Sequence, residues 1–132
     1  NIDLVPTVLS FIDVSNNKLP GINVLDNEKL EKRQTLFIEC YNHDILNVEK
    51  PTETVLYKVA LNKKWKLMVP NTDLVIRDFT DPRSNYYGFY SNQIQLFDLE
   101  QDPQEKINLA KRYPEIVEEM SSQINEWWQP IH

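Results

Sequence analysis

The sequence predicts a small α+β domain: an antiparallel sheet of about four strands, a C-terminal helix packed across one face and an N-terminal helix beside it. Alternating polar and apolar residues in several segments indicate the strands, and a helical stripe after Pro114 indicates the C-terminal helix. A hydrophobic content of 41% and a charged content of 26% are typical of globular proteins. The 132 residues therefore predict one domain, 1–132, with a real core.

The N-terminal segment predicts a helix that Asp3 caps, with Pro6 in its first turn and its end near Val14. Apolar residues recur at helical spacing along it: Leu4, Val5, Val8, Leu9 and Ile12. Residues 15–21 predict a loop, and residues 27–32 predict at most a short charged helix.

Three of the predicted strands cover residues 34–41, 54–61 and 64–69, and Asn62-Lys63 joins the last two as a hairpin. We expect Cys40, on the first strand, to be a small core residue, because free cysteine is often buried. A reactive thiol is the alternative, but only His43 is close in sequence to activate it. The basic cluster in the hairpin is interpreted as a solvated face that resists edge pairing: Lys58, Lys63, Lys64 and Lys66.

The segment 93–98 predicts the fourth strand, and Asp102-Pro103 predicts a tight turn after it. Glu105 follows Asp102 at capping-box spacing, which predicts a helical turn that ends near a left-handed Asn108. Pro114 predicts the start of the C-terminal helix. Its apolar stripe comprises Ile116, Val117, Met120, Ile124 and Trp127. We expect one ring of Trp127-Trp128 to be core and the other to be more exposed.

Charge and composition exclude some classes of function. A net charge of −6 argues against a nucleic-acid or general polyanion binder, because phosphate neutralisation needs a positive face. No apolar run approaches the roughly 20 residues that span a bilayer, and no signal peptide begins the chain, so we expect no membrane partner. The single cysteine forms no internal disulfide and leaves the redox compartment open.

The C-terminal third carries a family resemblance. The run Leu96-Phe97-Asp98-Leu99, followed by Asp102-Pro103-Gln104-Glu105, Asn108-Leu109-Ala110 and a Pro-Glu helix start, resembles the C-terminal signature of the type I, arylsulfatase-like sulfatases of the alkaline phosphatase superfamily. Three further pieces in the same order resemble that family: residues 1–9, residues 19–25 and Trp65-Lys66-Leu67-Met68. The resemblance spans nearly the whole chain.

The resemblance implies that the catalytic machinery lies upstream of these residues. The family's nucleophile sits in a Cys- or Ser-x-Pro-x-Arg motif whose Cys or Ser becomes formylglycine, and Asp and Asn residues bind its calcium. Cys40 is followed by Tyr41-Asn42-His43-Asp44, without the required proline and arginine, and no serine has the motif. We therefore expect a C-terminal fragment without catalytic residues, metal ligands or cofactor, whose partner is the parent's N-terminal catalytic domain. The N-terminal helix would lie against that domain, and the parent would be periplasmic or secreted.

The irregular segment 70–92 and the end of the first strand hold the candidate substrate-binding residues. Aromatic rings stack on sugars and arginine grips sulfate with two donors, so a substrate-reading loop is chemically sensible. The candidates are His43, Arg77, Arg83 and Tyr87. A lone histidine beside Asp44 is otherwise a structural or exposed residue, and long loops with tyrosines are otherwise variable insertions.

The predicted function is that of a C-terminal subdomain of a sulfatase, a sulfuric ester hydrolase, which scaffolds the catalytic domain, lines the substrate cleft and is inactive alone. Its ligand would be a sulfated carbohydrate or an aryl sulfate. Two alternatives stay open: a free-standing carbohydrate-binding or interaction domain, and the same subdomain of a phosphonate or phosphodiester hydrolase. The upstream nucleophile motif would separate the last from a sulfatase.

Overall fold

The computed structural model describes residues 2–14, 19, 21–42, 47–71 and 91–129. The chain forms two compact units, Asn1–Gln34 and Thr35–His132. None of the helices in these described residues has the length and apolar content that a membrane span requires.

The first unit contains helices α1 (Leu4–Phe11) and α2 (Asn27–Lys32). Helix α1 confirms the predicted N-terminal helix, although it ends before Val14. Helix α2 confirms the short charged helix, and the Asp26 carboxylate caps it by accepting a hydrogen bond from the Lys29 amide at 3.1 Å.

Asp3 does not cap α1 with its side chain, contrary to the prediction, and its backbone is helical. Its carboxylate instead accepts two hydrogen bonds from the Arg33 guanidinium, at 2.6 and 2.7 Å, and one from the Ile22 amide at 2.9 Å. A bidentate pair with arginine is stronger than a hydrogen bond to one backbone amide, which explains the choice. At Gly21 a Cβ atom would collide with the Ile2 carbonyl, so the residue there must be glycine.

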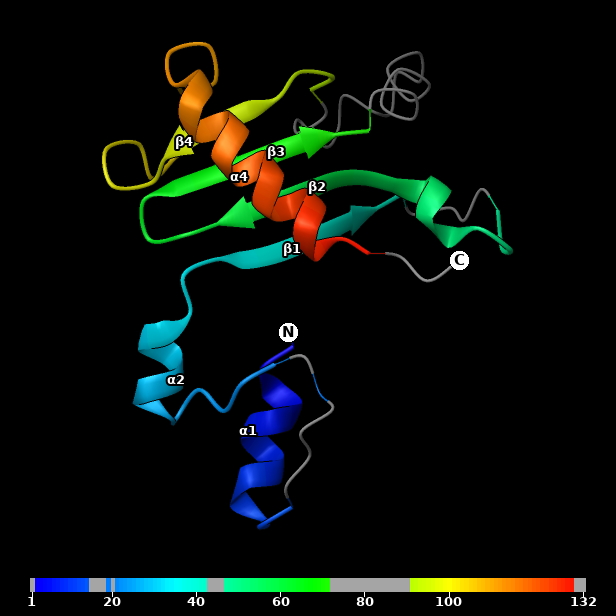
Figure 1. Cartoon of the computed structure of the whole chain (residues 1–132), viewed down its shortest axis with the longest axis vertical. Coiled ribbons are helices and arrows are strands. Elements are labelled where there is room, and N and C mark those ends of the chain that lie inside the picture. The colour runs from blue at the N-terminus through cyan, green and yellow to red at the C-terminus, as the bar shows by residue number, and fades with distance from the viewer. Residues whose placement is uncertain (1, 15–18, 20, 43–46, 72–90, 130–132) are drawn as a thin grey trace. The chain divides into compact units, whose positions relative to one another are not determined.

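The second unit is built on an antiparallel sheet in the order β1-β2-β3-β4 (Figure 1). The strands are β1 (Leu36–Tyr41), β2 (Val55–Leu61), β3 (Trp65–Pro70) and β4 (Gln95–Asp98), and the 3-10 helix η1 (Pro51–Thr54) precedes β2. Helix α4 (Pro114–Trp127) lies across one face of this sheet. These elements confirm the predicted α+β fold with its four strands and C-terminal helix, and α1 supplies the N-terminal helix.

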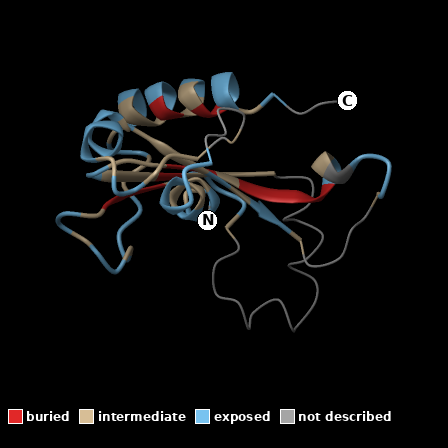
Figure 2. Cartoon of the chain, turned by 90° about the horizontal axis from the view of Figure 1, so that it is seen from below, coloured by how far each residue is buried: buried red, intermediate tan, exposed pale blue. Residues whose placement is uncertain are grey.

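The main core lies between α4 and the sheet (Figure 2). Alternation along the strands turns one set of side chains toward the helix, and Met120 and Ile124 meet them from α4. The fully buried members of this cluster are Ala60, Leu67, Leu96, Met120 and Ile124. The predicted stripe of α4 is confirmed, since Ile116 and Val117 also pack against this cluster.

The connection from β4 to α4 differs from the prediction. Residues 102–108 form turns and no helix. The Asp102 carboxylate accepts a hydrogen bond from the Ile107 amide at 2.8 Å, beyond the proline as expected, but Glu105 forms no capping box. Glu105, rather than Asn108, has the positive φ of 55°.

Cys40 is exposed, which makes the core prediction wrong. It lies on β1, an edge strand of the sheet. Its neighbour Glu39 pairs with Lys58 on the face that α4 covers, so Cys40 lies on the opposite face. Neither tryptophan of the C-terminal pair is fully buried. Trp127 is 41% exposed, although its ring stacks on Phe37 with a centroid separation of 5.0 Å.

Candidate functional site

The four candidate substrate residues, His43, Arg77, Arg83 and Tyr87, lie outside the described residues. The described residues that flank them are held by the sheet. The Asn42 amide donates to the Thr54 carbonyl at 2.9 Å, and the Asn71 amide donates to the Leu56 carbonyl at 2.7 Å. Antiparallel pairing puts the end of β1, the start of β2 and the end of β3 at one end of the strands, so Asn42 and Asn71, the described residues next to both candidate segments, lie at that end of the sheet.

A pocket of about 340 Å³, the Trp128 pocket, lies at this end of the sheet. The described residues that line it are Thr52, Val55, Lys58, Val69, Pro70, Asn71 and Trp128. They come from η1, β2, β3 and the residues that directly follow β3 and α4, all within the second unit. The pocket thus combines an ammonium, an amide, a hydroxyl and an indole.

Glu39 holds the indole of this pocket in place. Its carboxylate accepts a hydrogen bond from Trp128 Nε1 at 2.6 Å and another from the Tyr41 hydroxyl at 2.7 Å. The hydrogen bond to Glu39, with burial and the carboxylate charge, raises the pKa of Tyr41 to about 12. Both carboxylate oxygens of Glu39 are therefore engaged.

The Lys58 ammonium lies over the Trp128 ring, 3.8 Å from its centroid. Burial lowers the pKa of Lys58, and the negative charge of Glu39 opposes this shift. Within the described part of the chain, this ammonium makes no hydrogen bond or ion pair. Lys58 is thus a partly desolvated cation whose N–H groups can donate hydrogen bonds to a ligand.

The structure separates the lysines that the sequence groups together. Lys58 shares the helix-facing side of β2 with Ala60, whereas Lys66 lies on the other face of the sheet and pairs with Glu105 at 2.6 Å. Lys63 is exposed in the turn. The solvated-face interpretation therefore does not hold for Lys58. Its position between apolar Leu56 and Ala60 on one strand face was the signal that the sequence offered.

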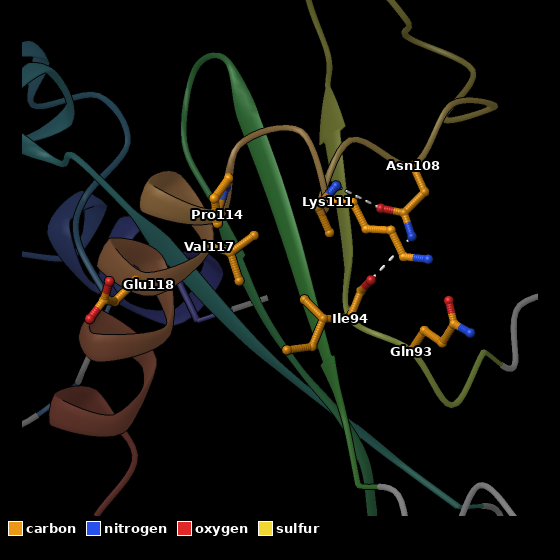
Figure 3. Close-up of a pocket in the computed structure, with 8 residues that line it drawn as sticks. Gln93, Ile94, Asn108, Lys111, Pro114, Val117 and Glu118 are labelled. Carbon is orange, nitrogen blue, oxygen red and sulfur yellow. Dashed lines mark hydrogen bonds between the residues drawn. The ribbon is translucent and has the colours of Figure 1, made fainter.

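A second, larger groove of about 680 Å³ lies between the N-terminal half of α4 and the residues before β4 (Figure 3). Its apolar residues are Ile94, Ala110, Pro114 and Val117, and its polar ones are Gln93, Asn108, Lys111 and Glu118. Asn108 Nδ2 donates to the Ile94 carbonyl at 3.1 Å, so the amide belongs to the fold. Opposite charges on Lys111 and Glu118 give this groove no preference for one sign of ligand.

Among the residues that the structure describes, no three His, Cys, Asp or Glu side chains gather where they could hold a metal ion.

The second unit is an α+β fold with a four-stranded antiparallel sheet and one covering helix. Solved structures of sulfatases contain the same fold as this chain. A candidate sulfatase from Bacteroides thetaiotaomicron matches 95% of this chain with a TM-score of 0.62 and 17% identity, and the match covers 23% of that protein. A 2-O GAG sulfatase matches 95% of this chain and 23% of its own length, with a TM-score of 0.61 and 17% identity.

A protein solved in complex with its substrate, D-glucosamine-2-N,6-O-disulfate, matches 94% of this chain and 22% of its own length, with a TM-score of 0.59 and 18% identity. The chain thus spans about a quarter of the length of these proteins and has the fold of a segment of sulfatases, as the sequence resemblance predicts. No family model and no curated protein matches the chain.

Proposed function

We propose that this chain is the C-terminal subdomain of a sulfatase, where it scaffolds the catalytic domain and borders the substrate cleft. The observation that carries the proposal is the fold match, which covers 95% of this chain but only 23% of the matched sulfatase. A segment with this coverage is a subdomain of a larger enzyme in the matched protein, and we extend that role to this chain.

The surface of α1 supports the docking role. Five apolar side chains on α1 or directly after it remain mostly exposed: Leu4 (57%), Val5 (52%), Val8 (52%), Phe11 (72%) and Ile12 (62%). At about 100° per residue, these positions fall within an arc of about 120° on the helix surface. A contiguous apolar stripe of this kind is typical of a surface that a protein partner covers. We assign the catalytic domain as that partner.

The chemistry would belong to the catalytic domain. Cys40 lacks the proline and arginine of the formylglycine motif, so this chain's cysteine does not fit the nucleophile. We propose that the nucleophile and calcium lie upstream, where calcium would neutralise the sulfate oxygens. This subdomain would contribute His43, Arg77, Arg83 and Tyr87 to substrate binding, because these residue types bind anions and sugar faces.

The first test reads the gene upstream of Asn1. The proposal expects a Cys- or Ser-x-Pro-x-Arg motif there. The encoded full-length protein should hydrolyse an aryl sulfate, and the 132-residue chain should not. A different nucleophile motif with phosphodiester or phosphonate hydrolysis, or turnover by the chain alone, would contradict the proposal.

The second test places a charge in the α1 stripe of the full-length protein. Burial of a valine side chain contributes about 1.5–3 kcal/mol, so Val8→Asp should lower the melting temperature and the yield of active enzyme. Ser10→Asp is the matched control, because residue 10 lies on the opposite side of α1 and its side chain only donates to the Thr7 carbonyl at 2.6 Å. Equal effects of the two changes would argue against docking through the stripe.

A further inference from the structure

We propose that the Trp128 pocket binds an oxyanion, and that Lys58 is its charged ligand with Thr52 and Asn71 as hydrogen-bonding partners. All the residues on which this proposal rests are described ones, and none of them is among the four candidate substrate residues. That the oxyanion is a sulfate group on a sugar rests on the proposed function, whereas the pocket itself rests on its geometry.

Three polar side chains of the pocket have unused hydrogen-bonding capacity. Within the described residues, the Lys58 ammonium, the Asn71 side-chain amide and the Thr52 hydroxyl make no hydrogen bond, although all three residues line the same cavity. Ammonium, amide and hydroxyl groups are all donors, and a sulfate or carboxylate group offers only acceptors in its ionised form. The polar inventory of the pocket therefore fits an oxyanion.

The ammonium of Lys58 is held in position for an anion. The Trp128 ring fixes the ammonium from one side, and Glu39 fixes the ring through Nε1. Glu39 does not line the pocket, and its two oxygens are engaged by Trp128 and Tyr41. An incoming anion would meet the ammonium from the cavity side, where it would compensate for the water that burial removes.

The net charge of −6 does not oppose this site. Local charge within about 10 Å dominates binding at physiological salt, since more distant exposed charges are screened. The carboxylate that acts on Lys58 is Glu39; its hydrogen-bond donors, Trp128 and Tyr41, are neutral, so its negative charge remains and weakens the attraction of an anion. One ammonium with two neutral donors predicts weak binding, in the millimolar range, to a single oxyanion.

The test is an NMR titration of the 132-residue chain with three probes: inorganic sulfate, N-acetylglucosamine 6-sulfate and N-acetylglucosamine, at constant ionic strength. The indole Nε1–H signal of Trp128 and the amide signals of Thr52 and Asn71 report on the pocket directly. We expect saturable shifts with both sulfated probes and none with the neutral sugar. Tighter binding of the sulfated sugar identifies a sugar substituent as the source, and equal binding identifies the free ion; both support an oxyanion site.

The variants are Lys58→Gln and its matched control Lys63→Gln. Loss of a charge-assisted hydrogen bond should weaken binding of inorganic sulfate at Lys58 by about tenfold or more. Lys63 is exposed in the turn at the other end of β2, so its loss should leave the affinity within about twofold. Near-UV circular dichroism verifies that both variants are folded.

Absence of saturable sulfate binding by the folded chain, or binding that Lys58→Gln leaves unchanged, would overturn the inference. Equal weakening by both variants would also overturn it, because it would mean nonspecific charge attraction. These outcomes leave the docking role untouched, since that role is tested by activity and stability of the full-length protein.

Discussion

Asp3 shows how one side chain organises the first unit. It joins the start of α1 to Arg33 and to the Ile22 amide, so a single carboxylate connects three distant parts of this unit. Asp3→Asn keeps one oxygen for the Ile22 amide but loses the charge and the second oxygen that bind Arg33. We expect it to cost about 1.5–3 kcal/mol, the usual contribution of a hydrogen bond to a charged group, and to raise hydrogen exchange at the Ile22 amide because Arg33 no longer fixes its acceptor. Asp13→Asn is the control, since it makes the same chemical change at an exposed residue. Unchanged exchange in Asp3→Asn would contradict this role.

The same carboxylate predicts a dependence on pH. The hydrogen bonds from Arg33 lower the pKa of Asp3 from 3.8 to about 2 in the folded chain. Because the folded pKa is depressed, the stabilisation is fully present above pH 3.8 and is lost as pH falls toward 2. An NMR titration of the Asp3 carboxyl carbon should give a midpoint near 2 in the native chain and near the ordinary value in Arg33→Gln. A midpoint near 3.8 in the native chain would contradict the prediction.

At the level of single residues, the sequence indicates which side of a strand a residue occupies but not what covers that side. The alternation correctly separates Cys40 from Glu39, yet the exposure of Cys40 follows from β1 being the last strand of the sheet. Likewise, Lys58 lies among apolar neighbours, but its contact with Trp128 joins residues 70 positions apart. Neither strand order nor a distant contact is contained in a local pattern. The candidates His43, Arg77, Arg83 and Tyr87 stay predictions.

Among the elements, β4 is the edge strand opposite β1, and the loop that follows it covers part of its backbone. Asn108 Oδ1 accepts hydrogen bonds from the Leu96 and Ala110 amides, at 3.1 and 3.0 Å, and the Leu109 amide donates to the Leu96 carbonyl at 2.8 Å. The loop after β4 therefore covers the backbone of Leu96, which an edge strand would otherwise expose.

We expect Asn108→Ala to lower the free energy of unfolding by about 1–3 kcal/mol, because the Leu96 amide loses its acceptor. Asn108→Asp keeps the acceptor and loses only the donation to the Ile94 carbonyl, so it should restore part of the loss. Gln104→Ala, an exposed change in the same loop, is the control. Urea unfolding followed by circular dichroism measures all three, and a wild-type midpoint for Asn108→Ala would contradict the prediction.

The elements themselves follow well from the sequence because each has a strong local signal. Alternation defines the strands, and Pro114 with its apolar stripe defines α4. The prediction of a helical turn at 102–108 is wrong for a physical reason. The Asp102 carboxylate could accept a hydrogen bond from the Glu105 amide or from the Ile107 amide; it binds Ile107, and Glu105 adopts a left-handed conformation. Spacing alone does not choose between a capping box and such a turn.

For the whole molecule, the distribution of buried residues separates the two units. All fully buried apolar side chains among the described residues lie between Val55 and Ile124, within the second unit. The first unit has no buried residue in α1 or α2, and polar contacts hold it, those of Asp3 and the hydrogen bond from the Val24 amide to the Thr7 hydroxyl among them. Its stability therefore has a different physical origin, which agrees with the proposal that a catalytic domain covers its apolar stripe.

The second unit should unfold as one cooperative structure, because α4 and three strands share one core. Ile124 is 1% exposed in that core, and its truncation to alanine should cost about 2–5 kcal/mol. Asn125→Ala is the control, since residue 125 is exposed on the same helix and should change stability by about 0.5 kcal/mol or less. Far-UV circular dichroism and tryptophan fluorescence should give the same lowered urea midpoint for Ile124→Ala, because helix and sheet lose their packing together. Separate midpoints for the two signals would mean that α4 and the sheet are held by different interactions, and the shared core would then not be the source of the fold's stability.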